Sequence, residues 1–263
     1  MRVESKFKYI YGPVYSWRLG MSLGIDPLSD KSKICNMDCV YCQLGKTVYW
    51  SNQRETFVPA SAIIDEIKAL PEMKLDYITF SGRGEPTLAA NLGDMVRGIR
   101  KIRSEKIAVI TNSILLDDVQ VRKDLCLTDF VLAKLDACDE ETLKSVDKVM
   151  QDVSFQKVVA GIKKFREDFK GKLALQIMFV AANKNFASQI AMIAADLGAD
   201  EIELNTPLRP SGVEPLLPEE LLEIKKFFNG QNVKTVYELE RKKVVPLNER
   251  DTIKRHGNYK KQK

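Results

Sequence analysis

The sequence predicts an α/β protein built on a parallel β-sheet. Short apolar runs of strand length alternate with segments of helical periodicity along the 263 residues. This alternation is typical of βαβ units, in which a helix connects one parallel strand to the next. We count six such strands, which favours a partial (β/α)6 barrel over a closed barrel of eight strands. The hydrophobic content of 44% and the charged content of 29% are ordinary for a globular protein.

The first predicted strand covers residues 19–25, where apolar residues alternate with Gly20, Ser22 and Gly24. This period of two indicates a strand with one closely packed face. A proline at the first helical position and isoleucines at helical spacing predict a helix over 60–70.

The same alternation continues through the middle of the chain. Further strands are predicted over 77–80, 107–110, 130–135, 173–180 and 202–204. Apolar residues three and four apart predict helices over 91–104, 119–125, 140–146, 155–169 and 186–197. A helix over 218–228 and an edge strand over 233–237 complete the pattern.

We assign residues 1–240 to one domain and 241–263 to a basic C-terminal tail. The tail carries nine Lys or Arg and two acidic residues, and the whole chain has a net charge of +5, so the rest of the chain is close to neutral. This charge makes RNA a candidate partner of the tail. A solvated terminus without a partner is the alternative.

Three of the five cysteines, Cys35, Cys39 and Cys42, lie within eight residues on a polar, glycine-punctuated loop. Closely spaced thiolates suit a soft metal or an iron–sulfur cluster, because these centres prefer sulfur ligands. Three cysteines leave one iron of a four-iron cluster open to a non-protein ligand. A structural zinc site needs a fourth ligand, and the only histidine, His256, is distant in sequence. Zinc or a redox thiol remains the alternative to a cluster.

The C-x3-C-x2-C spacing, with the aromatic Tyr41 before the last cysteine, resembles the cluster loop of the radical S-adenosylmethionine (SAM) superfamily. Gly84 and Glu85 resemble the Gly-Gly-Glu motif of that superfamily, with Arg83 in place of its first glycine. The resemblance implies a partial (β/α)6 barrel and a [4Fe-4S] cluster held by the three cysteines. It also implies SAM on the open iron and reductive cleavage of SAM to a 5′-deoxyadenosyl radical, which activates a C–H bond of the substrate.

Residues 12–26 are similar to a branch of the superfamily near the wybutosine-synthesis enzymes and the nitrogenase-cofactor maturases. The wybutosine enzymes carry a second, amino-terminal set of cysteines, whereas no cysteine precedes Cys35 here. That specific activity is therefore not expected. The resemblance further implies an external electron donor of the flavodoxin or ferredoxin type.

Polar residues at the ends of the predicted strands are candidate cofactor ligands, because ligands of parallel barrels bind at the carboxyl ends of the strands. Glycine at position 84 allows close backbone approach, and the Glu85 carboxylate is suited to receive an ammonium group. For Tyr41, Asn112, Asp136 and Asn205 we predict contacts with the adenine, ribose or carboxylate of the cofactor or with the substrate. Strand capping or simple packing is the alternative for each. No catalytic residue is assigned.

Four cationic residues, Arg18, Arg83, Lys134 and Arg209, are expected near the open mouth of the barrel. Their convergence would favour an anionic substrate such as a phosphate, a carboxylate or a nucleotide. Two further side chains, Gln176 and Met178, lie on the fifth predicted strand near the expected adenine or substrate.

The sequence contains no apolar run long enough for a membrane span and no secretory signal, so a cytoplasmic location without a membrane partner is predicted. Cys126 and Cys138 are isolated and predicted to be structural. We interpret the chain as a radical SAM enzyme acting in tRNA modification or cofactor biosynthesis. The alternative is a non-catalytic iron–sulfur electron carrier or an RNA-binding protein.

Overall fold

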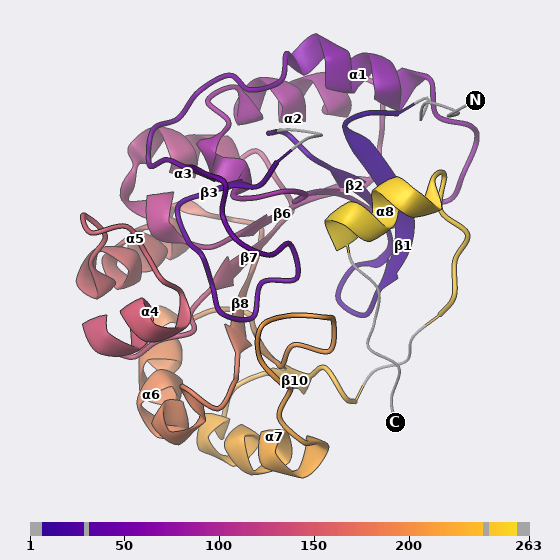
Figure 1. Cartoon of the computed structure of the whole chain (residues 1–263). Coiled ribbons are helices and arrows are strands. Elements are labelled where there is room, and N and C mark those ends of the chain that lie inside the picture. The colour runs from indigo at the N-terminus through magenta and orange to yellow at the C-terminus, as the bar shows by residue number, and fades with distance from the viewer. Residues whose placement is uncertain (1–6, 29–31, 239–241, 257–263) are drawn as a thin grey trace.

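The computed structural model describes residues 7–28, 32–238 and 242–256 (Figure 1). Its centre is an eight-stranded sheet with the order β1-β2-β5-β6-β7-β8-β9-β10. The pairs from β2 to β10 are parallel, and β1 runs antiparallel to β2. The strands are β1 (Ile10–Ser16), β2 (Gly20–Ile25), β5 (Tyr77–Phe80), β6 (Lys106–Thr111), β7 (Phe130–Lys134), β8 (Lys172–Met178), β9 (Glu201–Asn205) and β10 (Val233–Thr235). The predicted α/β fold with a parallel sheet is confirmed. In the described part of the chain no strand pairing joins β1 to β10, so the sheet stays open.

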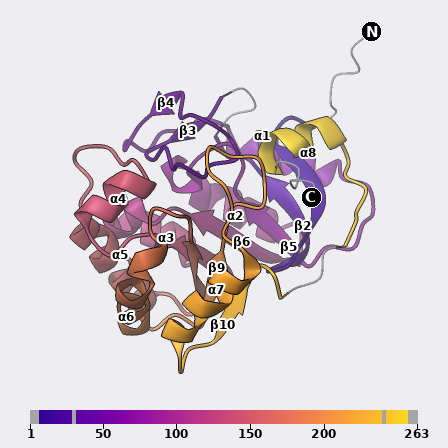
Figure 2. The same cartoon turned by 60° about the horizontal axis from the view of Figure 1, so that its bottom comes forward.

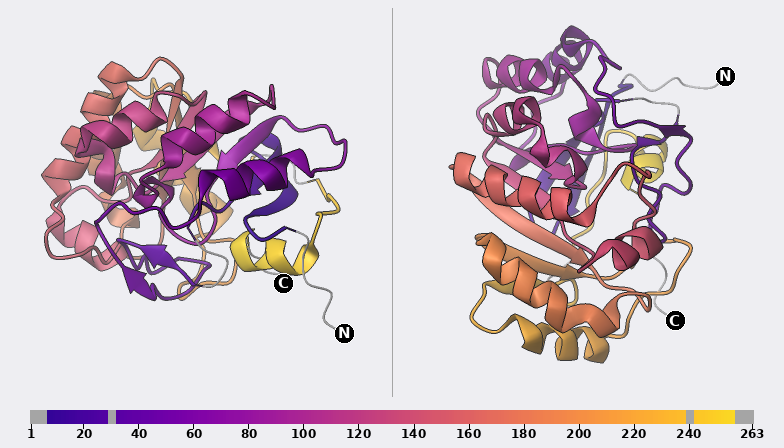
Figure 3. Two further views of the ribbon diagram at one scale, coloured as in Figure 1. Left: turned by 90° about the horizontal axis from the view of Figure 1, so that it is seen from above. Right: turned by 90° about the vertical axis from the view of Figure 1, so that its left-hand side faces the viewer.

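Helices cover one face of this sheet (Figure 1 and Figure 3). They are α1 (Ala60–Lys68), α2 (Leu92–Arg100), α3 (Val119–Leu125), α4 (Glu140–Val146), α5 (Phe155–Asp168), α6 (Ala187–Leu197) and α7 (Pro218–Lys225). Among the described residues, no helix combines the length and the apolar character that a membrane span requires.

The two faces of the sheet bury different side chains, because successive residues of a strand point to opposite sides. On β5, Ile78 and Phe80 belong to the large core under the helices. Tyr77 of the same strand instead packs against a small cluster on the inner face. That cluster is formed by Leu19, Ala108, Phe130, Leu132 and Ala174. It closes the bottom of the inner face and leaves the carboxyl ends of the strands open above it.

The predicted strands correspond to β2 and β5 to β10, but β1 and a small second sheet were not predicted. The second sheet pairs β3 (Ile34–Cys35) with β4 (Tyr49–Trp50) in parallel. Gly12-Pro13 interrupts the apolar alternation of β1, and the register with β2 shifts between Tyr11 and Val14. Two-residue strands such as β3 and β4 leave no period in a sequence, because tertiary docking alone forms them.

The predicted helix over 91–104 was too long. The α2 helix ends at Arg100, and the amides of Ile102 and Arg103 both bond to the carbonyl of Ile99, which ends the regular i to i−4 pattern. Ile102 is partly exposed although its apolar side chain fitted the helical period.

The described part of the predicted C-terminal tail, residues 242–256, includes a helix, α8 (Glu249–His256). The Gly12 amide of β1 donates to the Thr252 hydroxyl (3.0 Å). The Arg255 guanidinium forms a buried ion pair with Asp26 (3.0 Å). These contacts contradict the interpretation of this part as a solvated terminus. Residues 241 and 257–263 of the predicted tail lie outside the described residues.

Candidate active site

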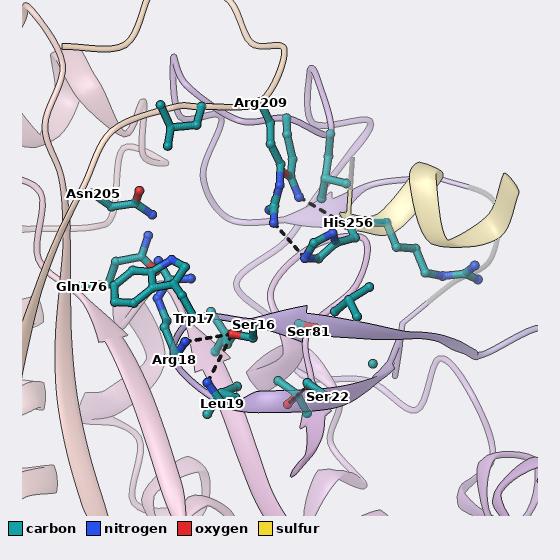
Figure 4. Close-up of a pocket in the computed structure, with 18 of the residues that line it drawn as sticks. Ser16, Trp17, Arg18, Leu19, Ser22, Ser81, Gln176, Asn205, Arg209 and His256 are labelled. Atoms are coloured by element: carbon teal, nitrogen blue, oxygen red, sulfur yellow. Dashed lines mark hydrogen bonds between the residues drawn. The ribbon is translucent and has the colours of Figure 1, made fainter. Parts of the chain in front are cut away.

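A cavity of about 300 Å³ opens at the carboxyl ends of the parallel strands (Figure 4). Six successive strands each contribute inward-facing residues to its wall: Ser22, Thr79, Ile110, Lys134, Gln176 and Asn205. The hydroxyls of Ser22 and Thr79 hydrogen-bond to each other (2.7 Å). The cavity therefore lies where ligands of parallel barrels bind.

The cysteine loop lies at the edge of this cavity and is held there by the turn after β5. The Ile34 amide donates to the Arg83 carbonyl (2.9 Å), and the Glu85 amide donates to the Ile34 carbonyl (3.0 Å). Gly84 has a φ of +153°, and a Cβ built on it would lie 1.6 Å from the Ile34 carbonyl oxygen. Only glycine allows this approach, so Gly84 both lines the cavity and seats the cysteine loop.

The other side of the loop is anchored on the end of α4. The Val40 amide donates to the Val146 carbonyl (2.9 Å), and the Asp38 amide donates to the Asp147 carbonyl (3.0 Å). The hydroxyl of Thr47 donates to the Met37 carbonyl (2.5 Å). Backbone hydrogen bonds on both sides therefore position the cysteines before any cofactor binds.

The three cysteines differ in exposure. Cys35 is buried, Cys39 and Cys42 are half-buried, and Cys42 lines the cavity. Burial raises the pKa of Cys35 to about 11 and that of Cys39 well above its usual range. Among the described residues, no group of three His, Cys, Asp or Glu side chains is arranged to hold a metal ion. Thiols lose their protons when they bind a metal.

The donor set fits an iron–sulfur cluster. Three thiols share one loop, and two cationic side chains lie beside them: the Lys134 ammonium is 3.5 Å from the Cys39 sulfur, and Lys33 is next to Cys42. These cations offset the negative charge that three thiolates would bring to a partly buried site. The amide nitrogen of Asn112 lies 3.7 Å from the Cys35 sulfur.

Tyr41 and Asp136 belong to a buried polar network below the loop. The Tyr41 hydroxyl is hydrogen-bonded to Asp136 and to Asp147 (3.1 Å for Asp147). Lys134 forms an ion pair with Asp136 (3.0 Å) and also contacts the Tyr41 hydroxyl. Burial, reinforced by the Asp136 charge, raises the pKa of Asp147 to about 7. Tyr41 and Lys134 line the cavity, whereas Asp136 does not.

The Glu85 carboxylate does not line the cavity. It accepts hydrogen bonds from the Thr87 amide (3.1 Å), the Thr87 hydroxyl (2.6 Å), the Thr111 hydroxyl (2.7 Å) and the Asn112 amide (2.7 Å). Burial raises the pKa of Glu85, and these hydrogen bonds oppose the rise. The carboxylate thus joins the turn after β5 to the end of β6. Its predicted contact with a cofactor ammonium stays a prediction.

Of the predicted cofactor and metal residues, Tyr41, Cys42, Gly84 and Asn205 line the cavity, together with Gln176 and Met178. The others do not line it but contact or adjoin residues of its wall or of the cysteine loop: Cys35, Cys39, Glu85, Asn112 and Asp136. The Asn112 side chain bonds to Asn36 of the loop (2.6 Å). The structure therefore gathers the residues around one site, in an inner and an outer layer.

Three of the four predicted cations, Arg18, Lys134 and Arg209, converge on the cavity, whereas Arg83 does not line it. Arg255 and His256 of α8 line it as well, and none of the described residues that line it is an Asp or a Glu. Arg209 donates to the Gln43 side chain (2.8 Å) and is hydrogen-bonded to His256 (2.7 Å), and Figure 4 shows this pair across from the turn that carries Trp17 and Arg18.

Sequence reasoning did not identify the turn residues Ser16 and Trp17, nor Arg255 and His256, as part of this wall. Ser16 and Trp17 were missed because strand β1 and the turn that follows it were not predicted. The basic C-terminal segment was analysed by its net charge alone, which does not show that two of its residues face a cavity.

Comparison with known proteins identifies the family of this chain. Residues 31–185 match the model of the radical SAM superfamily. A UPF0026 protein of Synechocystis is 36% identical, over 81% of this chain and 80% of that protein. A probable GTP 3′,8-cyclase of Saccharolobus islandicus is 26% identical, over 76% of this chain and 63% of that protein.

The fold is similar to that of a radical SAM methyltransferase from Sphaerobacter thermophilus, with a TM-score of 0.63 and 14% identity, over 81% of this chain and 65% of that one. Members of the superfamily are enzymes that use a [4Fe-4S] cluster and SAM and typically take electrons from an external reductant. The predicted branch near the wybutosine and nitrogenase-cofactor enzymes stays a prediction. The chain belongs to the radical SAM superfamily and, within it, to the UPF0026 proteins.

Proposed function

We propose that this enzyme holds a [4Fe-4S] cluster on Cys35, Cys39 and Cys42 and acts on a small anionic substrate bound in the cavity. When bound and reduced, the cluster supplies the electron that cleaves SAM to methionine and a 5′-deoxyadenosyl radical, which abstracts a hydrogen atom from the substrate. The observation that carries the proposal is the position of the cysteine loop at the edge of a cavity whose described lining includes basic residues and no carboxylate.

In this proposal, some residues contact SAM, others hold the cysteine loop in place, and others close the bottom of the cavity. Tyr41, Gly84 and Asn205, which line the cavity near the cysteine loop or at the strand ends, contact SAM. Glu85 and Asn112 act from behind the wall, where their hydrogen bonds hold the loop and the strand ends together. The inner-face cluster closes the bottom and limits the access of water to a radical.

The charge of the wall supports an anionic substrate. Arg18, Lys134 and Arg255 each have a carboxylate partner behind the wall, and Arg209 is hydrogen-bonded to two side chains of the wall itself. Cationic side chains on the wall, with their carboxylate partners behind it, suit phosphate or carboxylate groups of a ligand. The similarity to a probable GTP 3′,8-cyclase favours a nucleotide and hence cofactor biosynthesis over tRNA modification.

The RNA hypothesis depended on the basic C-terminal segment. Arg255 and His256 of this segment point into the cavity and contact the body of the protein. Arg255, one of the cations of this segment, is therefore engaged within the protein by Asp26, which weakens the support for an RNA-binding tail.

The proposal is tested by reconstituting the protein anaerobically with iron and sulfide, reducing it, adding SAM and measuring 5′-deoxyadenosine by chromatography. Product is expected from the parent and from Cys126→Ala, but not from Cys35→Ala or Cys42→Ala. A protein with a complete cluster that neither binds nor cleaves SAM would contradict the enzyme proposal and support an electron carrier.

The substrate class is tested in the same assay. A nucleoside triphosphate such as GTP is expected to raise 5′-deoxyadenosine formation several-fold, whereas the uncharged nucleoside guanosine is not, because the basic wall binds the phosphates. An equal response to both compounds would contradict an anionic substrate.

A further inference from the structure

An exposed apolar patch lies on the outer side of the cysteine loop. It consists of Val48, Tyr49 and Trp50, which we call the β4 patch, with exposed fractions of 71%, 47% and 41%. Among the described residues, these are the only three consecutive large apolar side chains that are all exposed. Figure 2 and the left view of Figure 3 show β4 at the outer edge of the molecule, away from the central sheet. Neighbouring exposed apolar residues of this kind mark interaction sites more often than scattered ones do.

The β4 patch is joined directly to the cluster loop. Trp50 is the strand partner of Cys35, and the Ser51 amide donates to the Cys35 carbonyl (3.4 Å). The Tyr49 amide donates to the carbonyl of Lys33, two residues before the same cysteine (3.0 Å). None of the three patch residues lines the cavity. A partner on the β4 patch would therefore contact the cluster loop without obstructing the substrate.

Positive charge flanks the β4 patch. Lys46 is exposed and lies two residues before Val48, and Lys148 is exposed where its carbonyl accepts a hydrogen bond from the Asp38 amide of the cluster loop (3.2 Å). Of the nearby acids, Asp38 pairs with Lys33 (3.5 Å), and the exposed Asp152 accepts a hydrogen bond from the side-chain amide of Asn52 (2.9 Å). Such a surface favours an acidic partner.

We propose that the β4 patch, with Lys46 and Lys148, docks the external electron donor, and that this donor is a small acidic flavoprotein of the flavodoxin class. The inference rests on the proposed function, which requires one electron for each cleavage of SAM. Electron transfer slows exponentially with distance, so the donor must dock close to the cluster ligands. Tyr49 and Trp50 offer aromatic faces to an exposed flavin ring, and the lysines steer an acidic protein. Small, weak and partly electrostatic interfaces are usual for redox encounters.

The test compares the parent with two variants, Tyr49→Ser/Trp50→Ser and Lys46→Glu/Lys148→Glu. Met192→Ser serves as a matched control, because Met192 is 69% exposed on α6, far from the loop in sequence and in the fold. Reduction of the cluster by photoreduced flavodoxin is followed by stopped-flow absorbance, and flavodoxin affinity is followed by titration. Iron content and reduction by dithionite check that each variant still holds its cluster.

Both patch variants are expected to lose about tenfold or more in the second-order rate of reduction by flavodoxin, as for the loss of a central aromatic anchor or of a steering charge. The parent rate should also fall as salt rises, and less so in the lysine variant. Parent-like rates in both variants would overturn the docking site. So would a parent dimer that Tyr49→Ser/Trp50→Ser converts to a monomer, because the patch would then bind a second copy. If dithionite-reduced parent makes no 5′-deoxyadenosine, the proposed function fails, but the flavodoxin measurements still decide the docking site.

Discussion

At the scale of single residues, the Glu85 carboxylate is the clearest case of a predicted site residue that is hydrogen-bonded within its own chain. The sequence predicted a functional carboxylate after the second strand, and the residue is indeed next to the candidate site. Its side chain, however, accepts four hydrogen bonds from the chain itself. A carboxylate has only acceptor oxygens, which matches four donors.

Glu85→Gln is therefore expected to destabilise the protein, because the amide would turn an N–H toward donors of Thr87, Thr111 or Asn112. The expected loss is about 1–3 kcal/mol in the free energy of unfolding. Urea denaturation measures it, with the exposed Glu72→Gln as a control that should change little. A weaker affinity for SAM at unchanged stability would contradict this and favour direct contact between Glu85 and the cofactor.

At the scale of elements, α8 is where the structure differs most from the sequence prediction, because a helix packed on the body is found within a predicted basic tail. Its sequence is polar and highly charged, so it has no broad apolar stripe that predicts a packed helix. The helix is instead held by specific polar contacts, of which the buried pair of Arg255 and Asp26 is the strongest candidate. The side chains of this pair are 2% and 0% exposed.

Arg255→Ala is expected to cost about 3–5 kcal/mol of stability, because it leaves the Asp26 carboxylate buried without its cation. The neighbouring Lys254→Ala removes only an exposed pair with Asp251 (3.4 Å) and should change stability by no more than about 0.5 kcal/mol. Urea denaturation of both variants gives the comparison. Similar losses in the two variants would show that α8 is not anchored through Arg255.

At the scale of the whole molecule, an ion pair crosses the opening of the sheet, from the turn after β1 to the strand next to β10. Arg18, in the turn between β1 and β2, forms an ion pair with Glu203 of β9. The Arg18 guanidinium also stacks on Trp17, 4.2 Å from the ring centroid. Burial raises the pKa of Glu203 to about 7, although the Arg18 charge lowers it.

This pKa makes the stability depend on pH. The unfolded chain loses the Glu203 proton near pH 4.5, whereas the folded chain keeps it until about pH 7. The folded state binds more protons in this window, so stability falls as the pH rises through it, by about 3 kcal/mol at 1.4 kcal/mol per unit. Glu203→Gln cannot titrate, so its stability relative to the parent should rise by about that amount between pH 4.5 and 7.5. Unfolding free energies at the two pH values test this, and a constant difference would contradict it.

The sequence alone determined the regular part of the fold and the superfamily resemblance of the cysteine loop, from which its role as the cluster site is proposed. The inner strands could be predicted because buried parallel strands are continuous apolar runs. The loop with Cys35, Cys39 and Cys42 could be recognised because the spacing of such rare residues is visible in the sequence without knowledge of the fold. The sequence could not show that Arg18, Lys134 and Arg209 converge on one cavity. These residues are separated by long stretches of chain, and only the fold brings them together.

Tertiary structure decided the rest. It placed β1 and α8 beside the cavity, turned the Glu85 carboxylate toward its own chain, and formed the two-residue strands that present Trp50 outside Cys35. These features arise from contacts between residues that are distant in sequence. The segments involved are too short or too polar to show a hydrophobic period in the sequence. Local patterns report propensity and spacing, whereas the direction in which a side chain points at a shared site is set by the packing of the whole molecule.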